Sequence, residues 1–329
     1  MRNVYRAKTM YQLLIILLVL DESKENKLYL DAEDLFLFKD KLNDLNFFSN
    51  VQLQKVKREN KFFRFFFTFL NAFLLKSVGW LFKKDRIIYT SQHNIRGAFF
   101  KELLHSKYII LIEDGFTSYN EFPDGIKNSL YLEHKKDFFV KAIFNSYFLN
   151  IENDNIEKYF YTSPLRLKDS IPRVYNYIKD KIVKTDITSR VIELPETYKN
   201  KLKSLFFDNQ ELQFENKKSV VLLTQPLLED RKLTESEMSK VIDLFDKTLD
   251  GYKNEGYAIL IKQHPREKNF LYKKMVLKYG IQEIDKNFPF ELLTLFGVKF
   301  DVGITYYSTS VESEIFNHRR YLRNEIKNL

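Results

Sequence analysis

Short runs of apolar residues alternate with amphipathic segments along both halves of the chain. The clearest run is Ala258 to Ile261, four apolar residues followed shortly by Pro265, which has no N–H to donate to a β-ladder. A run this short, closed by a breaker, is typical of a strand buried in a parallel sheet. The same reading predicts further strands at residues 3–6, 27–30, 51–56, 86–90, 108–112, 159–162, 219–224, 282–284 and 299–304, and helices at residues 11–20, 33–45, 95–104, 138–148, 234–249, 268–279, 289–296 and from 308 onward.

Strand and helix patterns alternate in each half, which is the rhythm of a doubly wound α/β fold. The pattern weakens between residues 117 and 217 and then restarts, and neither half has a mononucleotide glycine fingerprint. A chain of 329 residues fits two domains of about 150 residues each. The sequence therefore predicts two facing Rossmann-like domains with a cleft between them, at residues 1–180 and 181–329. The final helix could pack back on the first domain.

One segment, Phe62 to Phe82, has the length of a membrane span. Its internal Arg64, Asn71 and Lys76 argue against burial in hydrocarbon. Because lysines flank it on both sides, an amphipathic helix resting on an anionic membrane surface is one reading. A core helix of a phenylalanine-rich protein is the other. The apolar run at residues 11–20 is too short for a span and predicts a buried first helix capped by Thr9.

The amino-acid composition limits the kinds of chemistry and of binding partner that the protein can have. The chain has no cysteine, which excludes disulfides and thiolate catalysis and fits a reducing compartment. Its formal net charge of +9 points to an anionic partner: nucleotide phosphates, an acidic glycan or a membrane surface. The basic residues are scattered and no RNA- or DNA-binding motif occurs, so no nucleic-acid partner is predicted.

Polar clusters follow several of the predicted strands. In open α/β sheets, ligands bind at the carboxyl ends of the strands, so these clusters are the candidate site. They are Glu113-Asp114-Gly115, Thr224-Gln225-Pro226 with Glu229-Asp230 behind it, His264-Pro265-Arg266-Glu267, and Ser308-Thr309-Ser310.

Each cluster has a chemical and a structural reading. His264, one of five histidines, can donate to a phosphate or act as an acid or base near neutral pH, or it can cap a loop. Gly115 permits a tight turn that leaves the Asp114 carboxylate projecting, but an Asp-Gly pair is also an ordinary turn. Ser308 precedes a predicted helix, where hydroxyls and free amides cradle phosphate or simply cap the helix.

In this order, the clusters resemble a known family. Glu113-Asp114-Gly115, His264-Pro265 and Ser308-Thr309 resemble the acidic-acidic-Gly, His-Pro and Ser/Thr motifs of bacterial sialyltransferases. Within that group the chain is most similar to glycosyltransferase family 52, the lipooligosaccharide and capsule sialyltransferases. The segment at residues 9–14 resembles the family's Thr-Pro-hydrophobic-Gln-Leu start, with Met10 in place of proline. Residues 222–227 and 261–267 resemble its second-domain strands, and the resemblance spans residues 3–316.

The resemblance implies a GT-B architecture, with an acceptor-side first domain and a nucleotide-sugar-binding second domain. It also implies CMP-sialic acid as donor, inversion at the anomeric carbon, and no metal or other cofactor. The acceptor would be a terminal galactoside of a bacterial surface glycan. The net charge and the Phe62–Phe82 segment suit an enzyme of the bacterial cytoplasm that contacts the inner membrane face. A transferase of the same fold with another nucleotide sugar, and a non-catalytic glycan- or membrane-binding protein, are the alternatives.

The resemblance also assigns roles to residues. Asp114 would take the proton of the acceptor hydroxyl, because a hydroxyl is a poor nucleophile. Asp230 competes for this role, and Asp114 is preferred because it comes from the acceptor-side domain. His264 would donate to the leaving phosphate, which gains charge as the bond breaks. Glu113 would orient the first loop or the acceptor, and Gly115 would permit the turn of that loop. The remaining binding residues would be Thr224, Gln225 and Pro265 at the nucleotide side, Glu267 on the ribose hydroxyls, and Ser308, Thr309 and Ser310 on the phosphate.

Overall fold

The computed structural model describes residues 1–54, 81–91, 98–114, 118–119, 155–207, 218–230, 232–267, 271–286, 289–313 and 315–326. The predicted helix at 138–148, Gly115 and nearly all of Phe62–Phe82 lie outside these ranges. Within them, no helix is long and apolar enough to cross a membrane.

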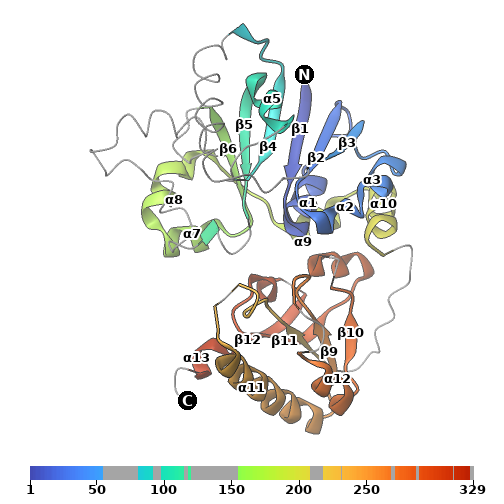
Figure 1. Cartoon of the computed structure of the whole chain (residues 1–329), viewed down its shortest axis with the longest axis vertical. Coiled ribbons are helices and arrows are strands. Elements are labelled where there is room, and N and C mark those ends of the chain that lie inside the picture. The colour runs from blue at the N-terminus through green and yellow to red at the C-terminus, as the bar shows by residue number, and fades with distance from the viewer. Residues whose placement is uncertain are drawn as a thin grey trace. The chain divides into compact units, whose positions relative to one another are not determined.

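The chain divides into two compact units, Met1–Arg190 and Val191–Leu329 (Figure 1). The predicted junction at 180/181 was too early, because β7 (Ile182–Lys184) pairs with β6 (Ile156–Tyr161) and so belongs to the first sheet. A three-residue edge strand with one partner leaves little apolar signal, which is why the sequence pattern missed it.

The first unit contains a seven-stranded sheet in which every recorded pairing is parallel, in the order β3-β2-β1-β4-β5-β6-β7. Its other strands are β1 (Arg2–Ala7), β2 (Asn26–Leu30), β3 (Asn50–Leu53), β4 (Arg86–Thr90) and β5 (Ser106–Ile112). The helices are α1 (Met10–Leu18), α2 (Glu33–Phe36), α3 (Lys39–Asp44), α5 (Ala98–Leu104), α7 (Pro164–Ser170), α8 (Pro172–Ile178) and α9 (Ile187–Glu193), which runs past the division.

Helix α1 confirms the predicted buried first helix. Thr9 is its N-cap, and the Thr9 side chain accepts a hydrogen bond from the backbone N–H of Gln12. All seven residues from Gln12 to Leu18 are buried. The single helix predicted at 33–45 is instead two short helices, α2 and α3.

The second unit contains a five-stranded sheet, again with parallel pairings only, in the order β10-β9-β8-β11-β12. The strands are β8 (Ser219–Leu223), β9 (Ala258–Lys262), β10 (Gln282–Ile284), β11 (Phe300–Thr305) and β12 (Phe316–Tyr321). The helices are α10 (Glu196–Phe207), α11 (Glu235–Asn254), α12 (Lys273–Tyr279) and α13 (Arg323–Ile326), with 3₁₀ helices η7 (Phe290–Phe296) and η8 (Thr309–Glu312).

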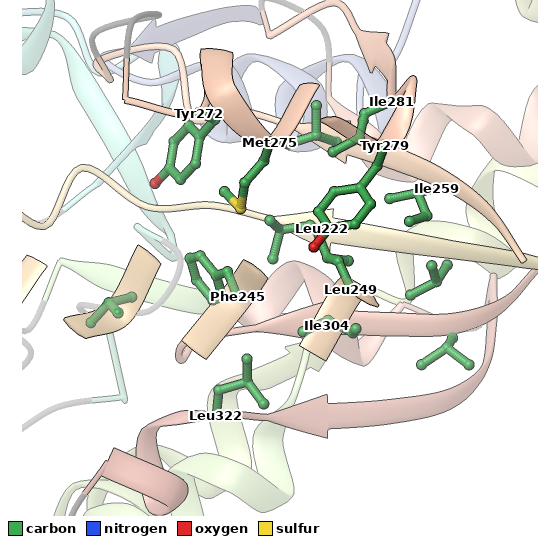
Figure 2. Close-up of a cluster of buried hydrophobic side chains, with 14 of the residues drawn as sticks. Leu222, Phe245, Leu249, Ile259, Tyr272, Met275, Tyr279, Ile281, Ile304 and Leu322 are labelled. Atoms are coloured by element: carbon green, nitrogen blue, oxygen red, sulfur yellow. The ribbon is translucent and has the colours of Figure 1, made fainter. Parts of the chain in front are cut away.

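The core of the second unit lies between its sheet and helices α11 and α12. Phe245 and Leu249 of α11 pack with Leu222 and Ile304 of the strands, and Met275 of α12 closes the same cluster (Figure 2). Helix α11 begins with the predicted capping box, in which Thr234 and Glu237 satisfy each other's backbone N–H groups. This core supports strands β8, β9 and β11, whose carboxyl ends carry the candidate residues.

The segment after Ser308 differs from the prediction. It forms the four-residue η8, strand β12 and the four-residue α13, rather than one helix that begins at Ser308. Strand β12 is an edge strand with exposed Asn317, His318 and Arg319, so it lacks the apolar run that identifies buried strands. The sequence predicted that Ser308 begins a full helix whose N-terminus could bind phosphate. The structure has a short 3₁₀ helix, η8, at that place.

Candidate active site

Glu113 is a buried carboxylate that directly follows β5. Its side-chain oxygens accept hydrogen bonds from the Thr162 N–H at 3.0 Å, from the Thr162 hydroxyl at 2.6 Å, and from the hydroxyls of Tyr11 and Tyr119. Burial raises the pKa of Glu113, and these donors oppose that rise. The carboxylate thereby ties α1, the end of β6 and the segment at 118–119 to the end of β5.

Asp114 follows directly and is partly buried. Its Oδ1 accepts a hydrogen bond from the side-chain amide of Gln12, and its backbone N–H donates to the Ser118 hydroxyl at 2.7 Å. The amide oxygen of Gln12 accepts from the Lys8 N–H at 2.8 Å. The side chain of Asp114 is therefore held from α1.

In the second unit, Glu267 is a buried carboxylate that accepts several hydrogen bonds, as Glu113 does in the first unit. The side chain is buried and accepts from the Tyr272 hydroxyl at 2.7 Å, the His264 N–H at 2.8 Å and the Thr224 hydroxyl. Burial raises the pKa of Glu267 as well. The expectation that Glu267 reads ribose hydroxyls does not agree with this arrangement, because its oxygens are occupied inside the protein. Glu267 instead holds the ends of β8 and β9 together.

Residues 264–267 form a tight turn in which the Glu267 N–H donates to the His264 carbonyl at 3.0 Å. Pro265 occupies the second position, where its restricted φ is favourable. Within the turn, the Arg266 N–H donates to Nδ1 of His264 at 3.2 Å. Burial, Arg266 and Lys262 lower the pKa of His264 from 6.5 to about 4. The imidazole is therefore neutral at pH 7 and carries its proton on Nε2, as a hydrogen-bond donor.

Hydrogen bonds also tie the ends of β8 and β11. The side-chain oxygen of Gln225 accepts from the Tyr307 N–H at 3.0 Å. The Thr305 hydroxyl donates to the Leu223 carbonyl at 2.9 Å and accepts from the Ser308 N–H at 3.0 Å. The structure thus brings Thr224, Gln225, His264 and Ser308–Ser310 to one edge of the second sheet.

Asp230, the competing base, is paired with Arg266. The two carboxylate oxygens accept from the two terminal nitrogens of the guanidinium, one of them at 3.2 Å. The Asp230 carboxylate is therefore engaged by a cation, whereas that of Asp114 is held by a neutral amide.

Several neighbours of the candidate residues were not predicted as site residues. Tyr11 donates a hydrogen bond to Glu113, and Gln12 donates one to Asp114. The sequence signals for these two residues were their place at the start of an apolar helix and the resemblance of residues 9–14 to the start of the family. At the second edge, Lys262 is buried, which lowers its pKa to about 8, and its ammonium donates to the Lys286 carbonyl at 2.8 Å. Glu291 is hydrogen-bonded to the Ser310 side chain, and burial raises its pKa.

The described residues contain no group of three or more His, Asp and Glu side chains arranged to hold a metal ion. The polar groups at the edge of the second sheet include donors, namely the Nε2–H of His264 and the hydroxyl of Ser308. Such a set suits an anionic, phosphate-bearing ligand.

Each unit is thus a parallel α/β sheet with a polar cluster after the carboxyl ends of its strands, which is where such sheets bind ligands. The sequence model of glycosyltransferase family 52 matches residues 32–317, and the chain belongs to this family. It is therefore a glycosyltransferase.

A relative from Haemophilus influenzae, described only as an uncharacterized protein, is 29% identical over 249 residues, which cover 74% of this chain and 70% of the relative.

Three solved structures show the same fold. The Photobacterium damselae sialyltransferase GT-B domain has a TM-score of 0.57 at 12% identity, covering 94% of this chain and 87% of its own. The 2,6-sialyltransferase of Photobacterium sp. JT-ISH-224, solved with CMP and lactose, has a TM-score of 0.59 at 13% identity, covering 97% and 70%. The α/β-galactoside α-2,3-sialyltransferase of Photobacterium phosphoreum has a TM-score of 0.53 at 14% identity, covering 92% and 84%. The predicted GT-B fold is confirmed.

Proposed function

We propose that this glycosyltransferase moves sialic acid from CMP-sialic acid to a terminal galactoside of a bacterial surface glycan, lipooligosaccharide or capsule. The observation that carries the proposal is the His264 turn at the edge of the second sheet, in which the Arg266 N–H donates to Nδ1 of His264 and leaves Nε2 to carry the proton of a neutral ring. The solved relatives supply the donor and acceptor classes, since one was crystallised with CMP and lactose and another is named for galactosides.

In the proposed reaction, the acceptor hydroxyl attacks the anomeric carbon of sialic acid while its proton passes to Asp114. The bond from that carbon to the phosphate oxygen breaks, and the electron pair leaves on CMP. One displacement of this kind inverts the anomeric centre. Gln12 orients Asp114, and Glu113 holds the backbone on which Asp114 sits.

The leaving phosphate gains negative charge as the bond breaks, and stabilising that charge lowers the barrier. His264 donates its Nε2–H to the phosphate, and Ser308, Thr309 and Ser310 supply further donors. Because its oxygens are occupied inside the protein, Glu267 is given no ribose role in this proposal. Thr224 and Gln225 keep the two strand ends in register.

A donor screen tests this proposal. The protein is incubated with lactose and, in separate reactions, CMP-sialic acid, UDP-sugars and GDP-sugars, with and without EDTA, and the released nucleotide is measured. We expect CMP release and a sialylated product only from CMP-sialic acid, unchanged by EDTA, with inverted anomeric configuration by NMR. The His264→Ala variant is the control, and we expect it to release much less CMP because it lacks the proposed donor to the phosphate. Release of UDP or GDP would replace the donor assignment, and no release from any donor would favour a non-catalytic binding protein.

The proposed acceptor is lipid-linked or membrane-bound, which gives the +9 charge and the Phe62–Phe82 segment a role. The segment would rest on the anionic inner face of the bacterial membrane from the cytoplasm. Flotation with vesicles of anionic lipid tests this against a variant in which Lys61, Arg64, Lys76 and Lys83 are replaced by Gln. We expect the natural protein to float with the vesicles and the variant to stay at the bottom. Equal flotation of both proteins would show that these basic side chains do not attract the protein to the anionic lipid.

A further inference from the structure

The start of α1 holds a buried amide whose orientation is set by two partners. Gln12 is 1% exposed. The backbone N–H of Lys8 donates to the amide oxygen at 2.8 Å, so the amide nitrogen must face the other way, toward Oδ1 of Asp114. The reverse orientation would place an N–H₂ against the Lys8 N–H and an oxygen against the Asp114 carboxylate. Both contacts would be repulsive.

We infer that Gln12 is a positioning residue for Asp114, an inference that rests on the proposed role of Asp114 as base. The backbone of Gln12 is itself anchored, since its N–H donates to the Thr9 hydroxyl at 3.2 Å. The preceding residue, Tyr11, donates a hydrogen bond from its hydroxyl to the Glu113 carboxylate. Two successive residues of one helix thus hold two successive residues at the end of β5, 102 positions later in the chain.

Two chemical effects follow from the Gln12 contact. A neutral donor on one carboxylate oxygen favours the ionised form, which is the form that accepts a proton. The contact also selects one rotamer of Asp114, and a misplacement of about 1 Å in a reacting group can cost roughly 100-fold in rate. Gln12 acts on the reaction through Asp114, so its effect should appear in kcat and in the pH profile rather than in donor binding.

Gln12→Glu is the sharpest variant, because it keeps the side-chain length and an oxygen for the Lys8 N–H while replacing the donor with a charge. We expect kcat with CMP-sialic acid and lactose to fall about 10- to 100-fold, with the KM for the donor unchanged. The acid limb of the kcat–pH profile should move to higher pH, since a like charge raises the pKa of Asp114. Gln12→Met should lower kcat without that upward move. Gln52→Glu, on strand β3, makes the same charge change elsewhere in the unit and should leave kcat and the profile unchanged.

Stability gives a readout that does not depend on turnover. The melting temperature should fall in Gln12→Glu and recover when Asp114→Asn is added, because the new amide can donate to the new carboxylate. Unchanged kcat, acid limb and melting temperature in Gln12→Glu, in a protein that turns over CMP-sialic acid, would overturn the inference while leaving the proposed function intact. If Gln12→Glu does not fold, the Gln12→Met variant tests the inference in its place. A normal kcat in Gln12→Met would overturn the inference that Gln12 positions Asp114. Absence of turnover in the natural protein would instead reject the proposed function, and with it the role that the inference gives to Asp114.

Discussion

Nδ1 of His264 accepts a hydrogen bond from the backbone N–H of Arg266, with 3.2 Å between the two nitrogens. Since Nδ1 must offer a lone pair, the proton of the neutral ring is on Nε2. The turn that begins at His264 thus selects the tautomer that can donate to a phosphate. A cationic imidazolium would lose the Arg266 contact and would lie beside the Lys262 and Arg266 charges.

The first prediction concerns the protonation of His264. We expect its ring to stay neutral between about pH 5 and 8, where histidines ordinarily titrate, because its pKa is lowered to about 4. Histidine NMR as a function of pH, with His264→Asn to assign the signal, measures this directly. A midpoint near 6.5 would contradict the prediction.

The same shift predicts how stability depends on pH. The unfolded histidine binds a proton below about pH 6.5, and the folded one binds it only below about pH 4. Between these values the unfolded state holds more protons, so the His264 contribution to folding stability is lost as the pH falls through this window. Urea unfolding of His264→Asn should therefore depend less on pH from 6.5 to 4 than unfolding of the natural protein. Parallel curves for the two proteins would disprove the linkage.

The second prediction separates the two candidate bases. Asp114→Asn should lower kcat by about 100- to 10,000-fold, the range usual for a lost general base. Asp230→Asn should weaken the contact with Arg266 and cost much less, because that carboxylate is already paired. Steady-state kinetics on both variants, with circular dichroism to show that each is folded, decides between them. A larger loss in Asp230→Asn would transfer the role of base to Asp230.

Periodicity and capping signals predicted the elements on which the site is built. Thr9 before the apolar run and Thr234-Glu-Ser-Glu before α11 are local signals, and both caps form. The strands with buried apolar runs, such as β8 and β9, were found for the same reason. The pattern failed at β12, where the exposed residues of an edge strand remove the apolar run, and in residues 163–207, whose short helices carry mixed charge.

The site itself was only partly predictable, because its decisive contacts join distant residues. The order of Glu113, His264 and Ser308 in the chain indicated the strand ends that carry the candidate site. No local pattern indicates that Tyr11 donates to Glu113 across 102 positions, or that Thr224 donates to Glu267 across 43. Glu267 was therefore given a substrate role, and the structure shows a buried carboxylate that holds the loop of His264.

The third prediction tests that role of Glu267. Glu267→Gln places an N–H₂ group among donors that point at a carboxylate, so one donor loses its acceptor. The free energy of unfolding should fall by about 1–3 kcal/mol, and kcat should fall because the His264 turn loosens. Tyr272→Phe removes one donor and leaves the carboxylate its other two, so we expect a smaller loss of about 0.5–1.5 kcal/mol with kcat nearly unchanged. Equal effects of the two variants on kcat would show that Glu267 does not act through the turn.

The fourth prediction concerns Gly303 on β11, which lets the turn that carries Ser308 to Ser310 lie close to the sheet. A Cβ at Gly303 would meet the Val311 side chain at 2.7 Å and the Phe316 ring at 2.9 Å, so η8 would have to shift. Gly303→Ala should lower the free energy of unfolding by about 1–3 kcal/mol and raise the KM for the donor. The matched control is Gly251→Ala within α11, where a Cβ meets nothing within 4 Å; alanine there should stabilise the helix by up to about 1 kcal/mol and leave KM unchanged. Thermal unfolding and donor titration measure both effects. An unchanged KM in a destabilised Gly303→Ala would mean that the Ser308–Ser310 turn does not contact the donor.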